Sequence, residues 1–136
     1  MNVIWFGLNK NQMIKDSIKK INFNNKFNKI SKHWSPKIIA ELNNYQFKLA
    51  KFKGDFIRHH HPETDEAFIV IEGEICIEFD GKTEILKSGE MIVVPRGVAH
   101  KPYSKKEAKV LIIEPRGVVN TGNISNELTL SSHNWI

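Results

Sequence analysis

The chain has 136 residues, 40% hydrophobic and 26% charged, which is typical of one soluble globular domain with its own core. No apolar run approaches the roughly 20 residues that a bilayer-spanning helix requires, and the first residues lack a signal-peptide pattern. The single cysteine, Cys76, excludes an internal disulfide and fits a reducing compartment. We therefore expect a cytoplasmic protein with no membrane partner.

The formal net charge is +5, and it comes mostly from lysines that are scattered along the chain. A basic balance can indicate a nucleic-acid partner, but such proteins gather their positive charge on one face or one recognition element. No such clustering is present in this sequence. We therefore expect no nucleic-acid partner and attribute the charge to a composition rich in lysine, asparagine and isoleucine.

The first third of the chain predicts an extension followed by the start of a β domain. Residues 1–12 show no clear period and are interpreted as a possible leader, because Met13 could be a natural start. Ile14, Ile18 and Ile21 have helix-like spacing, so residues 13–33 predict a short amphipathic helix that gives way to irregular chain at Asn24-Asn25. We therefore assign residues 1–33 to an N-terminal extension.

From Trp34 onward the apolar period shifts toward two, which is typical of strands separated by tight turns. Asp80-Gly81 is the strongest hairpin signal, because a type I′ turn requires positive φ at both central positions. Such a run of short strands predicts an all-β sandwich or barrel over residues 34–118. An irregular tail over 119–136 is expected to follow, and its residues 129–136 are expected to be either disordered or packed at an edge. The expected strands are 37–42, 45–52, 56–61, 66–71, 74–79, 82–86, 91–94, 99–103 and 108–114.

Four side chains in this region have the chemistry of metal ligands. Strand alternation places His59 and His61 on one face and turns His60 away from it. Glu66 begins the returning strand after a turn, and His100 follows the Pro95–Gly97 turn. Together they form a nitrogen and oxygen ligand set that suits iron(II), manganese, nickel, cobalt or zinc. Taken singly, each of them is more often an ordinary surface residue, so the prediction depends on their relation to one another.

The first part of this pattern resembles a known motif. His59-x-His61, four residues, Glu66, six residues and Gly73 match the spacing G-x5-H-x-H-x3,4-E-x6-G, except that Gly54 lies one residue closer to His59 than the pattern asks. This is the first motif of the cupin superfamily.

The second cupin motif, G-x5-P-x-G-x2-H-x3-N, is similar to the stretch that begins at Gly89. Pro95, Gly97 and His100 match in every spacing, and Ser104 replaces the final asparagine. The short stretch between the motifs is typical of small single-domain cupins, the type-2 proteins often labelled mannose-6-phosphate-isomerase-like. The resemblance covers roughly residues 13–127.

The resemblance implies a double-stranded β-helix, or jelly-roll barrel, with a divalent transition metal near one mouth. It places the metal ligands on His59, His61, Glu66 and His100. It also implies a homodimer, for which the segment 37–42 would be the strand that is exchanged or extended. The resemblance leaves the identity of the metal open.

Function is less constrained than fold, because related barrels perform many chemistries. We expect the metal to chelate a small oxygenated metabolite, such as a sugar or a hydroxy or keto acid, in an isomerase, lyase or dioxygenase reaction. The alternative is a non-catalytic cupin that binds or senses a small ligand. No residue in the sequence is identified as the general base.

The remaining candidates are interpreted as structural. Arg96 is expected to pair with a surface acid, and Cys76 to lie on the outer face of its strand. His33 and His133 lie outside the motifs and are expected at the surface. Three aromatic residues that could line the mouth of the barrel are more often core residues, namely Tyr45, Phe47 and Tyr103.

Overall fold

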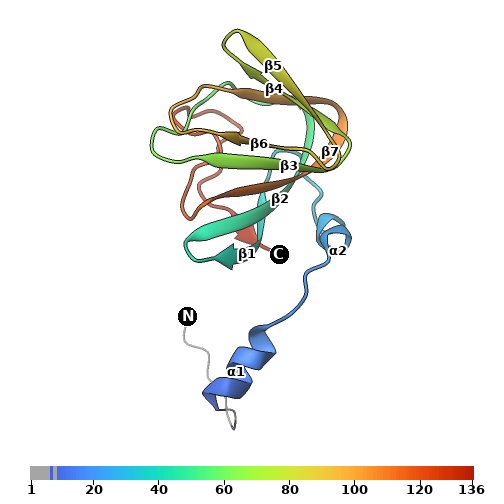
Figure 1. Cartoon of the computed structure of the whole chain (residues 1–136), viewed down its shortest axis with the longest axis vertical. Coiled ribbons are helices and arrows are strands. Elements are labelled where there is room, and N and C mark those ends of the chain that lie inside the picture. Colours follow the sequence, from blue (N-terminus) through green and yellow to red (C-terminus); the bar gives the residue numbers. More distant parts are fainter. Residues whose placement is uncertain (1–6, 8) are drawn as a thin grey trace.

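The computed structural model describes residue 7 and residues 9–136, and it shows a β-barrel with two short helices before it (Figure 1). The leader interpretation of residues 1–12 falls largely outside this described part. The helices are α1 (Lys10–Ser17) and α2 (Phe23–Phe27). The strands are β1 (Lys37–Leu42), β2 (Tyr45–Asp55), β3 (Glu66–Glu72), β4 (Glu74–Phe79), β5 (Lys82–Lys87), β6 (Met91–Val94), β7 (Lys101–Pro115) and β8 (Asn134–Trp135).

Asparagine side chains start both helices. The Asn9 side chain accepts a hydrogen bond from the Gln12 amide at 2.9 Å, and the Asn22 side chain accepts one from the Asn25 amide at 2.9 Å. These are N-caps, which satisfy amide groups that have no partner within the helix. The irregular chain expected at Asn24-Asn25 is therefore wrong, since both residues lie inside α2.

The sheet is organised around β7. Hydrogen-bonded neighbours along the sheet follow the order β5-β4-β7-β2-β1-β8. Outside this path, β3 pairs with both β7 and β6. The 15 residues of β7 contact β4 with their first part and β3 with their second part, and β2 pairs along nearly all of them. One long strand thus holds both walls of the barrel together, which confirms the β-barrel that the family resemblance implies (Figure 1).

Three expected boundaries are wrong. The strands expected at 99–103 and 108–114 form the single strand β7. Residues 105–107 of β7 are extra relative to β2, and a register shift between Phe52 and Gly54 of β2 accommodates them. The turn expected at Gly54-Asp55 is still part of β2. The strand expected at 56–61 is irregular apart from one isolated bridge at His59.

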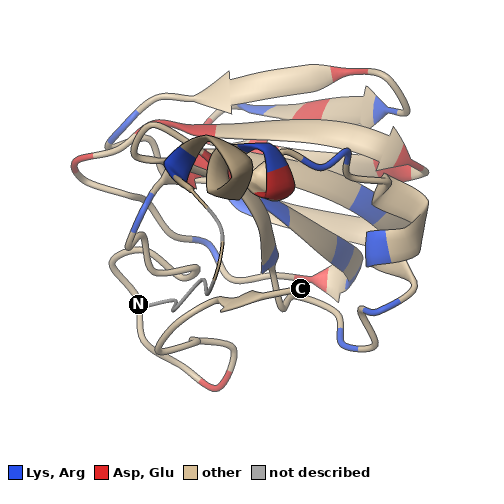
Figure 2. Ribbon diagram, turned by 90° about the horizontal axis from the view of Figure 1, so that it is seen from below, with Lys and Arg blue, Asp and Glu red and all other residues tan. Residues whose placement is uncertain are grey.

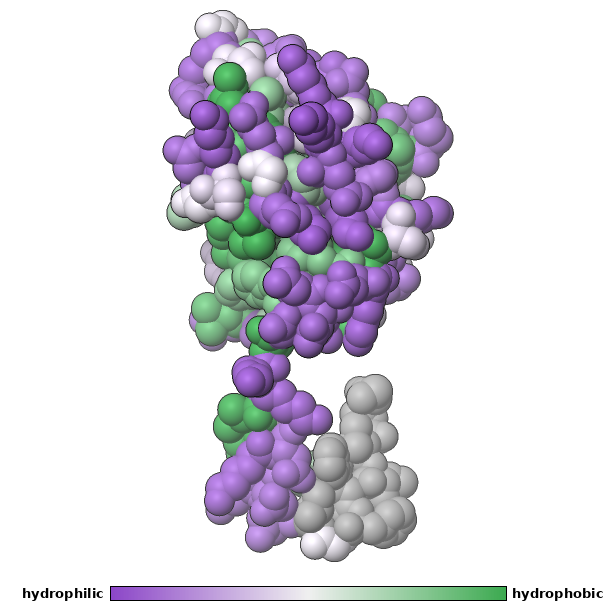
Figure 3. All heavy atoms as spheres, turned by 90° about the vertical axis from the view of Figure 1, so that its right-hand side faces the viewer, coloured by the Kyte–Doolittle hydropathy of each residue, from purple (hydrophilic) through white to green (hydrophobic). Residues whose placement is uncertain are grey.

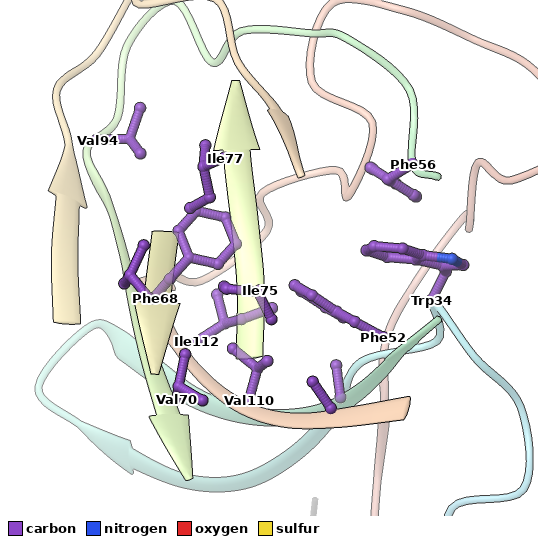
Figure 4. Packing of buried hydrophobic residues seen from close by; sticks show 13 residues of the cluster. Trp34, Phe52, Phe56, Phe68, Val70, Ile75, Ile77, Val94, Val110 and Ile112 are labelled. Carbon is purple, nitrogen blue, oxygen red and sulfur yellow. The ribbon is translucent and has the colours of Figure 1, made fainter. Parts of the chain in front are cut away.

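The barrel interior is filled by the inward faces of these strands. Trp34 stacks on Phe52 and Phe56 with ring centroids 4.2 and 4.9 Å apart, and Phe52 meets Phe68 edge to face (Figure 4). A second, smaller cluster on the outer face includes Phe27 and Ile30, so α2 covers part of the sheet. Gly73 between β3 and β4 has φ +88°, and a Cβ there would lie 3.2 Å from Ala108. This close approach explains the glycine of the first motif.

The C-terminal tail packs against the barrel edge, one of its two expected alternatives. β8 pairs in parallel with β1, and the Ile136 amide donates to the Ile38 carbonyl at 3.1 Å. Charged residues of both signs are interspersed over the strands and loops (Figure 2). Within the described residues, no helix has the length and apolar character that crossing a bilayer requires.

Candidate metal centre

The irregular stretch between β2 and β3 carries two of the four predicted ligands. The His59 amide donates to the His100 carbonyl at 3.0 Å, and the His100 amide donates to the His59 carbonyl at 2.9 Å. This reciprocal pair fixes the first motif beside the second. Glu66 opens β3 and pairs in register with Val94 of β6, which places its carboxylate at the same end of the barrel.

The structure brings the four predicted ligands together. One ligand atom from each of His59, His61, Glu66 and His100 can be chosen so that all lie within 4.8 Å of one another. Glu66 Oε1 lies 3.3 Å from His100 Nε2 and 3.6 Å from His61 Nε2. All four residues are buried, and the most exposed of them retains 6% of its surface. Buried groups gathered so closely need a shared partner.

The imidazole rings are oriented so that one nitrogen of each is free. His59 Nδ1 lies 2.9 Å from the Ile57 carbonyl, and His100 Nδ1 lies 2.9 Å from the Val98 carbonyl. A carbonyl accepts only, so each Nδ1 carries the proton and each Nε2 presents a lone pair. His61 Nε2, His100 Nε2 and Glu66 Oε1 are buried without a hydrogen-bond partner. Metal-binding histidines are typically oriented in this way, and a divalent cation fits the donor set.

The electrostatics favour neutral histidine and ionised glutamate. Burial, together with the nearby His100, lowers the pKa of His59 from 6.5 to about 4. Burial alone would raise the pKa of Glu66, but the imidazoles of His100 and His61 beside its carboxylate outweigh that effect and hold the pKa well below its usual range. Metal binding requires these protonation states, so the site is prepared for a cation at neutral pH.

Sequence reasoning missed two charged residues next to this cluster. Glu114 of β7 lines the same small cavity as Glu66, and it accepts a hydrogen bond from Lys48 Nζ at 2.7 Å. The Lys48 and Glu114 side chains are only 1% and 3% exposed. Burial and the charge of Glu66 raise the pKa of Glu114 well above its usual value, so Glu114 is the member of the carboxyl pair that takes up a proton more readily.

The signal that could have found these residues is strand period. Glu114 follows Val110 and Ile112 at intervals of two along β7, and Lys48 precedes Ala50 at the same interval along β2. Once the inward face of a strand is known, a charged residue in phase with its core positions is expected to point inward.

The segment after β7 closes over the ligands. The His60 amide donates to the Asn123 side chain at 2.9 Å, and the Asn123 amide donates to the His60 carbonyl at 3.0 Å. Gly122 lies so close that a Cβ would be 2.2 Å from the His60 oxygen. The space left beside His59 and Glu66 is about 30 Å³, roughly one water molecule. A larger ligand therefore does not fit on this side of the ligand cluster.

Most of the other candidates agree with the sequence interpretation. Arg96 Nε pairs with Asp65 at 3.2 Å on the surface, and His33 is exposed and contacts Glu107 at 2.8 Å. Cys76 lies opposite Tyr103 on the outer face of the barrel, as expected. His133 was expected at the surface, and this is wrong because its Nε2 is buried. Burial, with Lys48 and Lys37 nearby, lowers its pKa to about 4.

The core position favoured for the three aromatic residues is wrong for Tyr45, which is 46% exposed on the outer face and does not line the mouth either. Phe47 packs with the outer cluster.

Comparison with known proteins agrees with the fold and the motifs. The family described as Cupin domain (Cupin_2) matches residues 47–114. A cupin-2 domain protein of Shewanella frigidimarina NCIMB 400 is 55% identical, covers 71% of this chain and 94% of its own, and superposes with a TM-score of 0.70. Protein NMB1881 of Neisseria meningitidis is 34% identical over 71% of this chain and 99% of its own, with a TM-score of 0.66. Protein YdbB of Bacillus subtilis (strain 168) is 39% identical over 56% of this chain and 77% of its own. The chain is therefore a small single-domain member of the cupin family.

Proposed function

We propose that this cupin holds a divalent transition metal on His59, His61, Glu66 and His100 and uses it to chelate a small oxygenated metabolite. The observation that carries the proposal is the convergence of four buried donors within 4.8 Å, three of whose polar atoms have no protein partner. When bound, the metal supplies Lewis acidity for a carbonyl or hydroxyl oxygen. Three histidines and one carboxylate leave coordination positions open for a ligand in an octahedral ion.

The residues around the site support a role in proton handling. Glu114 lies beside Glu66 with a raised pKa, and both carboxyl groups line the small cavity next to the ligands. A carboxyl group with a raised pKa can donate or accept a proton near neutral pH. Glu114 is thus the acid or base that the sequence did not identify.

Metal content tests the proposal directly. Protein purified without a nickel column should contain about one divalent ion per chain, measured by elemental analysis, and the His59→Ala and His100→Ala variants should lose it. His33→Ala is the matched control, because His33 lies outside the cluster. Unchanged metal content in both ligand variants, or none in the parent protein, refutes the site.

Turnover separates an enzyme from a binding protein. The metal-loaded protein should be incubated with sugars, hydroxy acids and keto acids, while substrate loss and thermal stability are followed together. Chemical conversion that is lost in His100→Ala supports an enzyme. A ligand-induced rise in Tm with no conversion supports the non-catalytic binding cupin instead.

We also propose the homodimer that the family resemblance implies. Its support is apolar surface that the single chain leaves uncovered: Met91 and Val93 on β6 are 58% and 52% exposed, and Ile14 and Ile18 of the N-terminal segment are 49% and 73% exposed. Hydrophobic residues are visible both on the barrel and on the segment that carries α1 (Figure 3). Sedimentation velocity at micromolar concentration should give a dimer, and a monomer at all concentrations rules it out.

A further inference from the structure

A second cavity lies on the other side of the buried Lys48–Glu114 pair. It encloses about 200 Å³ between the start of β1 and β2 and the C-terminal segment, and its polar lining includes Gln46, Lys48 and His133. Ser131 and Ser132 also line it, and both are exposed, so the cavity opens to solvent on that side. Glu114 lines the small cavity beside the metal ligands, so the ion pair connects the two cavities.

One buried polar atom of this cavity has no partner. Among the described residues, five buried side-chain atoms lack a hydrogen bond. Three belong to the candidate metal ligands and one to Glu114, which contacts Glu66, and these are accounted for by the metal centre. The fifth is His133 Nε2, which no residue of the metal centre explains. Native proteins rarely bury a polar atom without a partner, so this atom points to a ligand.

The neighbours of His133 add unused hydrogen-bond donors. An ammonium group has three protons, and the Lys48 side chain makes one hydrogen bond, to Glu114. Gln46 is 6% exposed, and its amide nitrogen has only a long 3.5 Å contact to Glu41. Donors that converge on one cavity recognise an acceptor-rich group, such as a carboxylate or a phosphate.

The charge of the loaded metal centre favours an anion in the same place. A divalent ion and Lys48 carry three positive charges, whereas Glu66 and an ionised Glu114 carry two negative ones, and the three histidine ligands are neutral. At least one positive charge therefore remains in a buried region, and more remains if Glu114 is protonated. The interaction also reaches His133, since the charges of both Lys48 and Glu66 affect the pKa of that histidine. A buried net charge requires a counter-ion.

We propose that the cavity lined by Gln46, Lys48 and His133 is a binding site for a small oxyanion, coupled to the metal centre through the Lys48–Glu114 pair. The oxyanion is a carboxylate or a phosphate group, because both offer several acceptor oxygens to the same donors. Binding of metal and anion is mutually favourable, and the coupling is reciprocal. The coupling rests on the proposed metal function, whereas the anion site itself does not.

The test is a titration of the protein with sodium acetate and, separately, with inorganic phosphate at constant ionic strength. NMR resonances of the His133 and His33 imidazole rings report where the anion binds, and His33 serves as the distant exposed control. The titration is made on metal-free protein and on protein loaded with one equivalent of zinc. We expect a saturable shift of His133 and none of His33, with Kd several-fold lower in the zinc form. Whichever anion binds more tightly identifies the source as a carboxylate metabolite or a phosphate compound.

Two variants locate the site. Lys48→Met/Glu114→Gln removes the donor and its partner together, so that no buried charge is left alone, and it should raise the anion Kd about tenfold. For this variant the reporter remains His133. His133→Phe retains a ring but removes the nitrogen, and calorimetry should show an anion Kd at least about threefold higher.

The outcomes separate the two proposals. Equal, linear shifts of His133 and His33 indicate a salt effect and overturn the anion site. An anion Kd that is unchanged in both variants also overturns it, because the anion would then bind elsewhere, for example directly to zinc. Failure of zinc to bind refutes the proposed function, while the metal-free titration still decides whether the cavity takes an anion.

Discussion

Replacement of Lys48 by methionine tests the buried ion pair that lies between the two cavities. Methionine retains most of the apolar stem but removes the ammonium group that donates to Glu114 at 2.7 Å. The pair is almost wholly excluded from water, with 1% and 3% of the two side chains exposed. Removing one partner of such a pair costs about 3–5 kcal/mol, because the remaining charge is left buried. This is a large fraction of the roughly 5–15 kcal/mol that stabilises a typical domain.

Protonation of Glu114 limits that cost at low pH. The pKa of Glu114 is raised in the folded protein, so a neutral Glu114 favours folding below the pKa of the unfolded chain, and this contribution is lost as pH rises through the folded pKa. Loss of Lys48 removes an interaction that lowers this pKa, which raises it further. The destabilisation of Lys48→Met relative to the parent protein should therefore grow as the pH rises above the usual pKa of a glutamate.

Urea unfolding of the metal-free protein measures this cost. A double-mutant cycle compares Lys48→Met, Glu114→Gln and the double variant, in which both charges are absent. The double variant should recover at least about half of the free energy of unfolding lost in Lys48→Met, since replacing both partners of a buried pair is often close to neutral. A coupling energy below about 0.5 kcal/mol at pH 7 would refute the reasoning.

Three further predictions concern the ligands and the closing segment. Stability of the metal-free protein should fall as pH drops from about 6.5 to about 4, because the lowered pKa of His59 contributes stability above that window; urea titrations showing a flat profile contradict this. Glu66→Gln should preserve the circular dichroism spectrum yet weaken zinc at least about 100-fold by calorimetry, since the ligand charge is lost. Gly122→Ala places a Cβ 2.2 Å from the His60 oxygen, so it should lower the free energy of unfolding by about 1–3 kcal/mol more than Gly117→Ala does. Gly117 is the control, because it also has positive φ but open space around it, and equal losses of stability in thermal unfolding exclude the contact as the cause.

The sequence determined the barrel and the membership of the ligand cluster. Alternation of period two specifies strands whatever surrounds them, and β4 and β6 have the expected bounds. The distances along the chain from His59 to Glu66 and from Gly89 to His100 are fixed by strands and turns of set length. Local geometry therefore carries this information, and the family motif preserves it.

Local pattern failed where the barrel imposes its own path. Residues 56–61 were expected to form a strand, yet they form only one isolated bridge, between His59 and His100. The Phe56 amide donates to the Pro102 carbonyl and the His59 amide to the His100 carbonyl, so this stretch is held by single contacts near the start of β7. The sequence predicts two strands where the structure has the single strand β7, because the alternation breaks at 105–107. Pairing with β2 on both sides of this break holds the strand together. Pairing partners far away in the sequence decide such cases.

Only the tertiary structure decided which face of β2 points inward and what surrounds the metal ligands. The sequence separates Gln46 and Lys48 from the aromatic face of Tyr45 and Phe47, and hydrophobicity alone favours burying the aromatic face. The structure instead turns the face of Gln46 and Lys48 inward together with Ala50 and Phe52. Glu114 offers Lys48 a buried partner there, and α2 covers part of the other face. His133 enters the same interior from the last residues of the chain. A strand's period fixes which residues share a face, but the direction of that face depends on partners that only folding brings together.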